Sequence, residues 1–428
     1  MTGTERGRMN RKVRVGVLGV KRGTGLMEYS LDSCGSKMEV VAICDKWIEG
    51  LEKEKEKHPD SGIVFYPDFD DFINHDMDAV VLANYGNEHA PFAVRCLNRG
   101  LHVYSEVTAC QNMKEAVELV EAVERSGKIY ALAEQYCFMP APRKMKEYYG
   151  AGKLGELELA DCEYAHDSSD AWHRLTFGDP DHWRNRAYST FYCTHSLGPI
   201  LHATGLRPVS VTGYESSHNE RRYSVGAKTA AFGLSLITLD NGAIVKALNG
   251  NLRGGTLWYA MYGSKGKMES ARSITKDGGV GHFSAELDGP DGKEVLESLY
   301  LSGDVSASDY DPYGGAEHVC FGQFIDRVLG DETADVIGVY EALDMTLPGL
   351  FAYRSILQGG VPLDVPDLRD KRQRELYRND TLCTDPKAAG DMLVPACSKG
   401  EPDIAPEVYE RIRRKFLEEM EKGEFKPE

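Results

Sequence analysis

Arg14-Val-Gly-Val-Leu18 leads directly into Gly19-Val-Lys-Arg-Gly23-Thr-Gly25, and this junction is the most informative part of the sequence. The first stretch is a short apolar run, which is typical of a buried strand. The glycines that follow let backbone amides approach a pyrophosphate at a helix N-terminus. The spacing departs from G-x-G-x-x-G because Lys21 stands two residues after Gly19. A plain tight turn would also use glycines, but the position between a first strand and a helix indicates a dinucleotide-binding turn.

Apolar runs and amphipathic segments alternate from this junction onward. The expected strands are residues 14–18, 39–44, 78–83, 101–105 and 128–133, and the expected helices are 46–57, 89–99 and 112–126. Near-continuous apolar strands separated by amphipathic helices indicate a parallel sheet that is covered on both faces. The sequence therefore predicts an α/β fold with a doubly wound Rossmann domain over residues 12–138.

The pattern changes after Pro140 and Pro142. Strand-like segments separated by Gly, Asn and Asp turns predict an open, mainly antiparallel sheet, so residues 139–428 are expected to form an α+β substrate-binding domain. Its expected strands are 157–166, 209–215, 229–239, 243–249, 257–263 and 267–270, and its helices are 316–329 and 338–357. The remaining expectations are an acidic loop insertion at 283–313, an ordered but extended tail at 360–404, and a terminal amphipathic helix at 405–421.

Composition excludes several classes of protein. The 428 residues suggest two or three domains, and a formal charge of −17 argues against nucleic-acid binding. No apolar run reaches the roughly 18 residues of a membrane span, and the N-terminus shows no secretory signal. The ten cysteines lack CxxC or zinc spacing, so we expect reduced thiols and a cytoplasmic protein.

Polar residues stand where the expected parallel strands end. Asp45 closes the second strand 26 residues after Gly19, where a carboxylate would accept hydrogen bonds from an adenosine ribose and repel a 2′-phosphate. This favours NAD over NADP, and a helix N-cap is compatible with the same place. Glu106 follows the fourth strand, and Glu134 and Gln135 follow the fifth. Each could be a helix cap or a solvated turn, but ligands of doubly wound sheets bind at these strand ends.

A dense polar and aromatic constellation lies in the second domain. It consists of Glu163-Tyr-Ala-His-Asp167, His182-Trp-Arg184 and Tyr192-Cys-Thr-His-Ser-Leu-Gly-Pro199. A lone histidine is usually a satisfied core residue, but three such clusters close together favour a site in which His195 acts as a base. No HxxxH or HxH spacing occurs, so no metal is expected.

These residues resemble the Gfo/Idh/MocA family, whose members pair an NAD-binding Rossmann domain with an α/β substrate domain. The resemblance is carried by the glycine turn, Glu88-His-Ala-Pro91, Gly100-Leu-His-Val-Tyr-Ser-Glu106, Tyr340-Glu-Ala-Leu-Asp-Met-Thr346 and Gly359-Gly-Val-Pro-Leu-Asp-Val-Pro366. Sugar dehydrogenases of that family carry Glu-Lys-Pro after the fourth strand, whereas this chain has Glu106-Val107-Thr108. The family's catalytic lysine is therefore replaced by an alkyl side chain.

The chain is more similar to the NAD-dependent glycosidase branch, the α-N-acetylgalactosaminidase type. The resemblance rests on Glu106-Val107, Glu134-Gln135, the Tyr-x-His-Asp of residues 164–167, Trp183-Arg184 and residues 192–199, with Thr108, Gln135, Cys193 and Ser196 departing from the branch pattern. It implies transient oxidation at C3 of a glycoside, with His195 taking the hydroxyl proton and Tyr192 or Tyr164 the C2 proton. The alternatives are a net sugar or polyol dehydrogenase and a catalytically silent sugar or NAD sensor.

The resulting site prediction combines residue patterns and resemblance. The expected catalytic residues are His195, Tyr192 and Tyr164; the expected NAD-binding residues are Gly19, Lys21, Arg22, Gly23, Thr24, Asp45, Asn84, Glu106 and Gln135; and the expected substrate-binding residues are Glu106, Glu134, His166, Asp167, Trp183 and Arg184. The expected partner is a small carbohydrate or glycoside. The family analogy and the open sheet also suggest a homo-oligomer, either a dimer or a tetramer.

Overall fold

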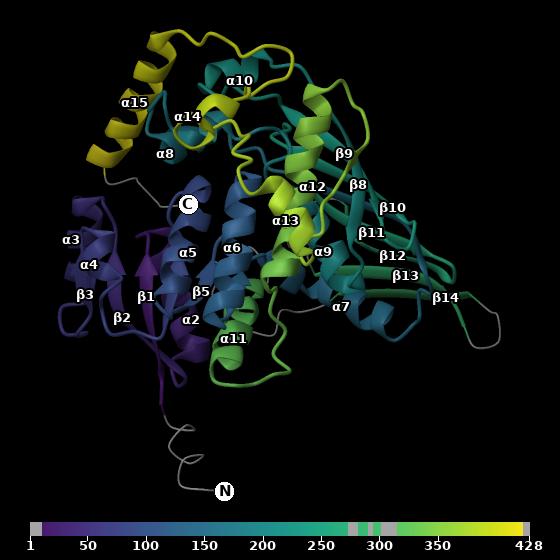
Figure 1. Ribbon diagram of the computed structural model, residues 1–428, viewed down its shortest axis with the longest axis horizontal. Coiled ribbons are helices and arrows are strands. Elements are labelled where there is room, and N and C mark those ends of the chain that lie inside the picture. Colours follow the sequence, from purple (N-terminus) through teal and green to yellow (C-terminus); the bar gives the residue numbers. More distant parts are fainter. Residues whose placement is uncertain (1–10, 273–280, 290–293, 301–314, 423–428) are drawn as a thin grey trace, which may run out of the picture. The chain divides into compact units, whose positions relative to one another are not determined.

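The computed structural model describes residues 11–272, 281–289, 294–300 and 315–422 (Figure 1). Contacts divide the chain into two compact units. Unit 1 comprises Met1–Gln111, Glu115–Glu134 and Glu317–Ala342, and unit 2 comprises Asn112–Lys114, Gln135–Ala316 and Leu343–Glu428. Within the described ranges, none of the helices combines the length and apolar character that crossing a membrane requires.

Unit 1 is built on a six-stranded sheet in the order β3-β2-β1-β4-β5-β6. All five neighbouring pairs are parallel. The strands are β1 (Val13–Leu18), β2 (Met38–Cys44), β3 (Val64–Tyr66), β4 (Ala79–Leu82), β5 (His102–Ser105) and β6 (Tyr130–Leu132). The connecting helices are α2 (Arg22–Cys34), α3 (Ile48–Lys57), α4 (Phe69–Phe72), α5 (His89–Asn98) and α6 (Met113–Ser126). Strand order reverses between β1 and β4, and this arrangement confirms the predicted doubly wound class.

The core of unit 1 follows from the strand composition. Val15, Val17, Val80 and Val81 have no solvent exposure, because central parallel strands are covered on both faces. Burial of each such side chain contributes about 1.5–3 kcal/mol. The sequence prediction missed β3 and α4, since β3 has only three residues at the sheet edge and begins with the exposed Val64.

Unit 2 contains a nine-stranded sheet in the order β14-β13-β12-β11-β7-β10-β9-β8-β15. Its strands are β7 (Leu157–Ala165), β8 (Pro208–Glu215), β9 (Phe232–Leu239), β10 (Ile244–Gly250), β11 (Thr256–Gly263), β12 (Gly266–Ser270), β13 (His282–Asp288), β14 (Glu294–Tyr300) and β15 (Leu363–Asp364). β10 pairs in parallel with β7, and the other neighbours are antiparallel. The predicted mainly antiparallel sheet is therefore confirmed.

The predicted loop at 283–313 is wrong for its first half. Residues 282–300 contribute β13 and β14, which pair as antiparallel neighbours. Phe283, Ala285 and Leu287 alternate as buried residues, and this period of two outweighs the acidic, turn-rich composition of the segment. Residues 290–293 and 301–314 lie outside the described part of the chain.

One face of this sheet packs against helices. α7 (Pro140–Gly150) contacts β12 and β13, and α9 (Cys193–Thr204) contacts β7, β10 and β11. The opposite face leaves apolar side chains exposed: Leu159 at 42%, Leu236 at 40% and Ile244 at 39%. Ile244 is the register partner of Leu159, so these two side chains are neighbours on that face.

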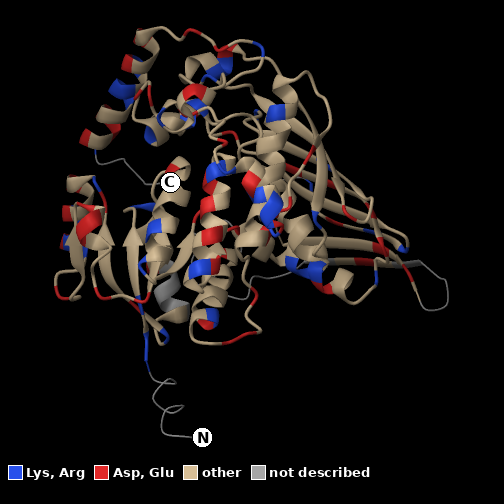
Figure 2. Ribbon diagram, in the orientation of Figure 1, with Lys and Arg blue, Asp and Glu red and all other residues tan. Residues whose placement is uncertain are grey.

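The C-terminal third also follows the prediction in outline. The tail at 360–404 buries Val365 and Leu368 and contains two short helices, α13 (Lys371–Tyr377) and α14 (Pro386–Ala389), which the sequence did not indicate. The expected terminal helix is α15 (Pro406–Glu421). It carries charges of both signs along its length (Figure 2) and packs through Val408, Tyr409 and Ile412.

The predicted division into residues 12–138 and 139–428 stays a prediction, and the contacts add one segment to the N-terminal unit. α11 (Ala316–Val328) belongs almost entirely to unit 1, as do the residues up to Ala342. The physical reason is aromatic packing, since the ring of Tyr104 on β5 lies 5.1 Å from Phe321 and 5.3 Å from Phe324. The Leu132 N–H also donates to the Ile337 carbonyl, with 2.9 Å between the nitrogen and the oxygen.

Candidate functional site

The glycine turn in unit 1 brings three backbone segments close together. Gly19 has a φ of +109°, and a Cβ there would lie 2.4 Å from the Ala83 carbonyl oxygen. A Cβ on Gly23 would lie 2.7 Å from Val17 Cγ1, so glycine lets α2 approach β1. Lys21 occupies the left-handed region at φ 69°, and Thr24 Oγ1 accepts from its backbone N–H at 3.1 Å. The turn is thus shaped as a cradle at the start of α2, as a bound pyrophosphate requires.

Asp45 holds this turn through its carboxylate. One oxygen accepts from Val20 N at 2.8 Å and the other from Trp47 N at 2.8 Å. The carboxylate therefore sits at the end of β2 beside the glycine turn, which is where an adenosine ribose binds in a doubly wound domain. Lys21 Nζ lies 4.5 Å from the centre of the Trp47 ring, and burial lowers the pKa of this lysine to about 8, against an opposing effect of Asp45.

Arg22 joins two buried carboxylates of unit 1. Its Nε and Nη2 both lie 2.7 Å from Glu106 Oε1, and its Nη1 lies 2.7 Å from Glu317 Oε1. Glu106 follows β5, and Glu317 lies on α11. The sequence prediction did not include Glu317, because its position beside the strand ends arises from a segment two hundred residues downstream in the chain.

The side-chain amide of Asn84 is buried and has no hydrogen-bond partner within the described protein. It follows β4, and both its Oδ1 and its Nδ2 are buried without a hydrogen-bond partner. Buried amides normally have partners, so these orphaned atoms are an expected feature of a binding site. The glycine cradle, the Asp45 carboxylate and this amide fit a dinucleotide at the carboxyl ends of β1, β2 and β4.

A second constellation lies within unit 2 and surrounds His195 at the start of α9. The imidazole centre lies 4.4 Å from the ring of Tyr136, 4.6 Å from Tyr164 and 5.5 Å from Tyr192, whose ring is parallel to it. His195 is only 6% exposed, and its carbonyl accepts from Tyr259 Oη at 2.7 Å. The structure thus brings the three predicted catalytic residues together. Sequence reasoning missed Tyr136, although it follows directly on the selected Gln135.

The two candidate tyrosines differ in their polar partners. Arg184 Nη1 donates to Tyr192 Oη at 2.8 Å, whereas Tyr164 Oη meets His166 Nδ1 at 3.3 Å. A guanidinium that donates to a phenol oxygen stabilises the phenolate formed when the tyrosine has lost its proton. This arrangement makes Tyr192 better suited than Tyr164 to act as an anionic base.

The other predicted substrate residues are placed differently. Trp183 is 9% exposed, its Nε1 is buried without a partner, and its ring stacks under the Arg184 guanidinium at 4.7 Å. Asp167 instead pairs with Arg221 at 3.1 Å. Burial would raise the pKa of Asp167, but hydrogen bonds from Ser169 and the charge of Arg221 lower it overall. Asp167 is therefore occupied by protein partners.

Glu134 and Gln135 fall on opposite sides of the division between the units. Glu134 is fully buried in unit 1, and Gln135 starts η2 (Gln135–Phe138) in unit 2. Gln135 Oε1 is buried without a hydrogen-bond partner. The roles assigned to the individual site residues stay predictions.

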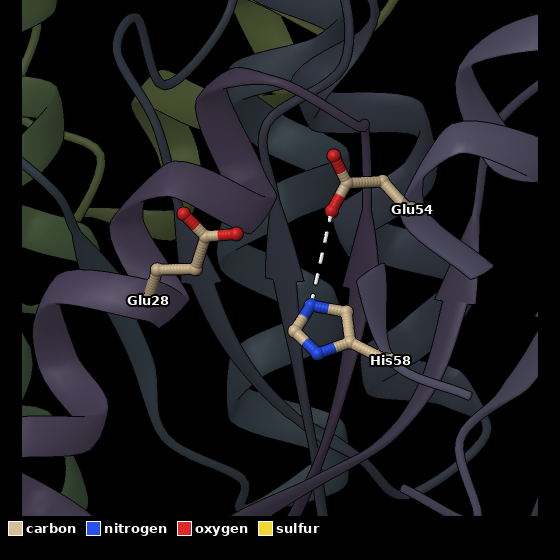
Figure 3. Close-up of side chains that lie close together, drawn as sticks. All are labelled: Glu28, Glu54 and His58. Carbon is tan, nitrogen blue, oxygen red and sulfur yellow. Dashed lines mark ion pairs between the residues drawn. The ribbon is translucent and has the colours of Figure 1, made fainter. Parts of the chain in front are cut away.

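One group in the described part of the chain has metal-ligand character, and it lies within unit 1. Glu28 on α2 faces Glu54 and His58 of the α3 region, with their ligand atoms within 4.8 Å of one another (Figure 3). The Lys57 ammonium lies 2.6 Å from Glu54 and 3.8 Å from Glu28. The Lys57 ammonium already pairs with both carboxylates, and Glu54 is only 6% exposed, so we describe the group as a partly buried ion-pair network.

Comparison with known proteins identifies the N-terminal region. Residues 13–134 match the Gfo/Idh/MocA model described as "Oxidoreductase family, NAD-binding Rossmann fold". The chain is similar to a "Glycosyl hydrolase family 109 protein" of Streptomyces filamentosus, with 23% identity over 83% of this chain and 77% of the relative. It is also similar to an "Alpha-N-acetylgalactosaminidase" of Tannerella forsythia, with 24% identity over 77% of this chain and 80% of the relative.

Solved structures share the fold at low identity. An inositol dehydrogenase homologue from Azotobacter vinelandii, crystallised with NAD⁺, matches with a TM-score of 0.67 and 16% identity, covering 83% of this chain and 97% of that one. These findings confirm the predicted Gfo/Idh/MocA resemblance, the Rossmann fold and NAD as the cofactor, and they indicate an NAD-dependent enzyme.

Proposed function

We propose that this protein is an NAD-dependent glycoside hydrolase that acts without net oxidation of its substrate. The observation that carries the proposal is the constellation around His195, in which the imidazole lies beside the rings of Tyr164 and Tyr192 and Arg184 donates to the Tyr192 phenol. The chain has no lysine at the position after Glu106, where the family's sugar dehydrogenases carry one. The curated relatives named as glycosidases support the same choice.

In such a reaction, His195 and Tyr192 would each carry out a different proton transfer. When bound, NAD⁺ supplies a reversible hydride acceptor for C3 of the sugar. His195 takes the proton of the C3 hydroxyl, so that a ketone forms. Tyr192, supported by Arg184, removes the C2 proton that the ketone has made acidic, and the aglycone then leaves from C1 by β-elimination. Water adds to C1, and the same groups return their protons as C3 is reduced again.

The alternative is a net sugar or polyol dehydrogenase, and the fold favours it equally, because solved neighbours are dehydrogenases. The deciding experiment is a panel of aryl glycosides of both anomers, assayed with added NAD⁺ while phenol release and NADH absorbance are followed together. Phenol release without NADH accumulation supports the hydrolase. Stoichiometric NADH with an intact glycosidic bond would overturn it in favour of the dehydrogenase. Tight NAD binding with neither signal would favour the silent sensor.

We also propose that two copies of the chain associate through the uncovered face of the nine-stranded sheet. Leu159, Leu236 and Ile244 expose 39–42% of their surface there, on three adjacent strands. Clustered apolar residues on a sheet face are typical of a protein interface. Light scattering of the wild type and of a charged variant on this face tests the proposal.

A further inference from the structure

The four-residue 3₁₀ helix η3 (Trp183–Arg186) carries the arginine that supports the proposed base. Arg184 Nη1 donates to Tyr192 Oη at 2.8 Å, and the Arg184 guanidinium lies 4.7 Å from the centre of the Trp183 ring. A 3₁₀ helix has poorer hydrogen-bond geometry than an α-helix and occurs in short pieces. The direction of the Arg184 side chain therefore depends on the contacts that hold η3 from outside.

Arg186, at the end of η3, ties this segment to the tail at 360–404. Its Nη1 and Nη2 contact the two carboxylate oxygens of Glu401 at 2.5 and 2.8 Å, and its Nε donates to the Thr384 carbonyl at 2.8 Å. Thr384 Oγ1 donates in return to the Arg186 carbonyl at 2.7 Å. Two parallel bonds from a guanidinium to one carboxylate define its orientation as well as adding energy. These contacts of Arg186 with Glu401 and Thr384, which we call the tail clamp, fix both its side chain and its backbone.

The tail clamp is largely shielded from water. The side chains of Arg186 and Glu401 are 14% and 26% exposed, and Thr384 is 6% exposed. The Lys228 ammonium lies 3.5 Å from Glu401, and the backbone N–H of the same lysine donates to the Asn185 carbonyl at 2.8 Å. One lysine thus links the carboxylate of the tail clamp to the middle of η3. Because partly buried ion pairs are screened less than exposed ones, this linkage persists at physiological salt.

We propose that Arg186 is a positioning residue, and that the tail clamp keeps Arg184 against the Tyr192 phenol. Arg186 and Glu401 are 215 residues apart in the sequence, so the tail completes a site whose other parts are encoded far upstream. The catalytic consequence rests on the proposed function, in which Tyr192 removes the C2 proton. Reaction rates respond steeply to such placement, since a shift of about 1 Å can lower a rate about 100-fold.

Two variants weaken the tail clamp without touching Arg184. Glu401→Gln replaces one of the two acceptor oxygens by an NH₂ group, and Thr384→Val removes the hydroxyl that donates to Arg186. In both variants the rate of C2 exchange in D₂O should fall at least about fivefold, while KM changes less than about twofold, because the substrate still binds but the base is misplaced. Thr384→Ser keeps the hydroxyl and should retain the wild-type rate.

Asp380→Asn is the matched control, because it breaks a second two-oxygen ion pair of the same tail. Asp380 pairs with Arg354 on α12 (Val339–Leu357) at 2.6 and 2.8 Å. Its loss loosens the tail without involving η3, so C2 exchange should stay within about twofold of the wild type. Circular dichroism and thermal denaturation of every variant ensure that folded protein is compared.

A readout of the contact itself separates this proposal from the hydrolase assignment. The ¹³Cζ resonance of Tyr192, assigned by its loss in Tyr192→Phe, responds to hydrogen bonding at the phenol oxygen. In Glu401→Gln and Thr384→Val it should move toward its position in Arg184→Lys, and in Asp380→Asn it should stay in place. The proposal is overturned if the resonance keeps its wild-type position in both clamp variants, or if Asp380→Asn moves it as far. Absence of C2 exchange in the wild type would refute the hydrolase, and the resonance alone would then decide whether the tail clamp positions Arg184.

Discussion

Replacement of Arg184 by lysine tests the assignment of Tyr192 as the C2 base. The hydrogen bond from Arg184 Nη1 to Tyr192 Oη is 2.8 Å long, and lysine at this place cannot reproduce the guanidinium geometry. Hydrogen bonds that involve a charged group contribute about 1.5–3 kcal/mol. If this contact stabilises the phenolate in the transition state, its loss lowers the rate of C2 proton removal about 10- to 150-fold, at about 1.4 kcal/mol for each factor of ten.

The assay is incorporation of deuterium at C2 of the product sugar in D₂O, followed by mass spectrometry or NMR. Tyr192→Phe should remove the base altogether and lower exchange by about 10²–10⁴-fold, as is usual for loss of a general acid or base. Tyr164→Phe is the matched control, because the Tyr164 hydroxyl meets His166 Nδ1, whereas Arg184 donates to the Tyr192 hydroxyl. The assignment is wrong if Tyr164→Phe abolishes exchange while Tyr192→Phe and Arg184→Lys retain it.

Three further outcomes are expected. Asp45→Ala should lower the preference for NAD over NADP by at least about tenfold, measured as the ratio of dissociation constants, and an unchanged ratio would refute the role of this carboxylate. Hydrogen bonds from Arg174 and then His173 lower the pKa of Glu419 from 4.5 to about 2, so its stabilisation is present above about pH 4.5 and is lost as the pH falls toward 2. Glu419→Gln should therefore lower stability by about 1 kcal/mol at pH 7, and thermal denaturation should show this difference shrinking below pH 4.5; a difference that grows in acid would contradict the ion pair. Leu159→Lys should shift the protein toward monomer in light scattering, and an unchanged mass would argue against the proposed interface.

The elements that could be predicted from the sequence are those whose structure depends on a local pattern of residues. Continuous apolar runs indicated β1, β2, β4, β5 and β6, and the glycine turn indicated the dinucleotide cradle, because period and turn chemistry are local properties. The short edge strand β3 was missed because three residues carry too little pattern. The hairpin of β13 and β14 was missed because its composition resembled that of a loop.

The candidate site was predictable only in part. Tyr164, Tyr192 and His195 were selected from their residue types, and the structure places their rings together. Tyr136 and Glu317 were not selected, because their roles depend on neighbours that are distant in sequence. Asp167 was selected because it stands in the same polar and aromatic cluster as Tyr164. In the structure it pairs with Arg221, a partner that no local pattern in the sequence indicates.

The assignment of α11 to unit 1 has a consequence for synthesis on the ribosome. The strands of unit 1 are all translated before residue 135, but Phe321 and Phe324, which cover Tyr104, emerge nearly two hundred residues later. Tyr104 is only 1% exposed in the complete chain, so the nascent Rossmann sheet leaves an apolar surface open until α11 arrives. Partly folded intermediates of this kind are prone to aggregate. An expression fragment that ends at residue 138 would retain this open surface permanently, whereas a fragment of unit 1 with residues 317–342 rejoined by a linker would close it.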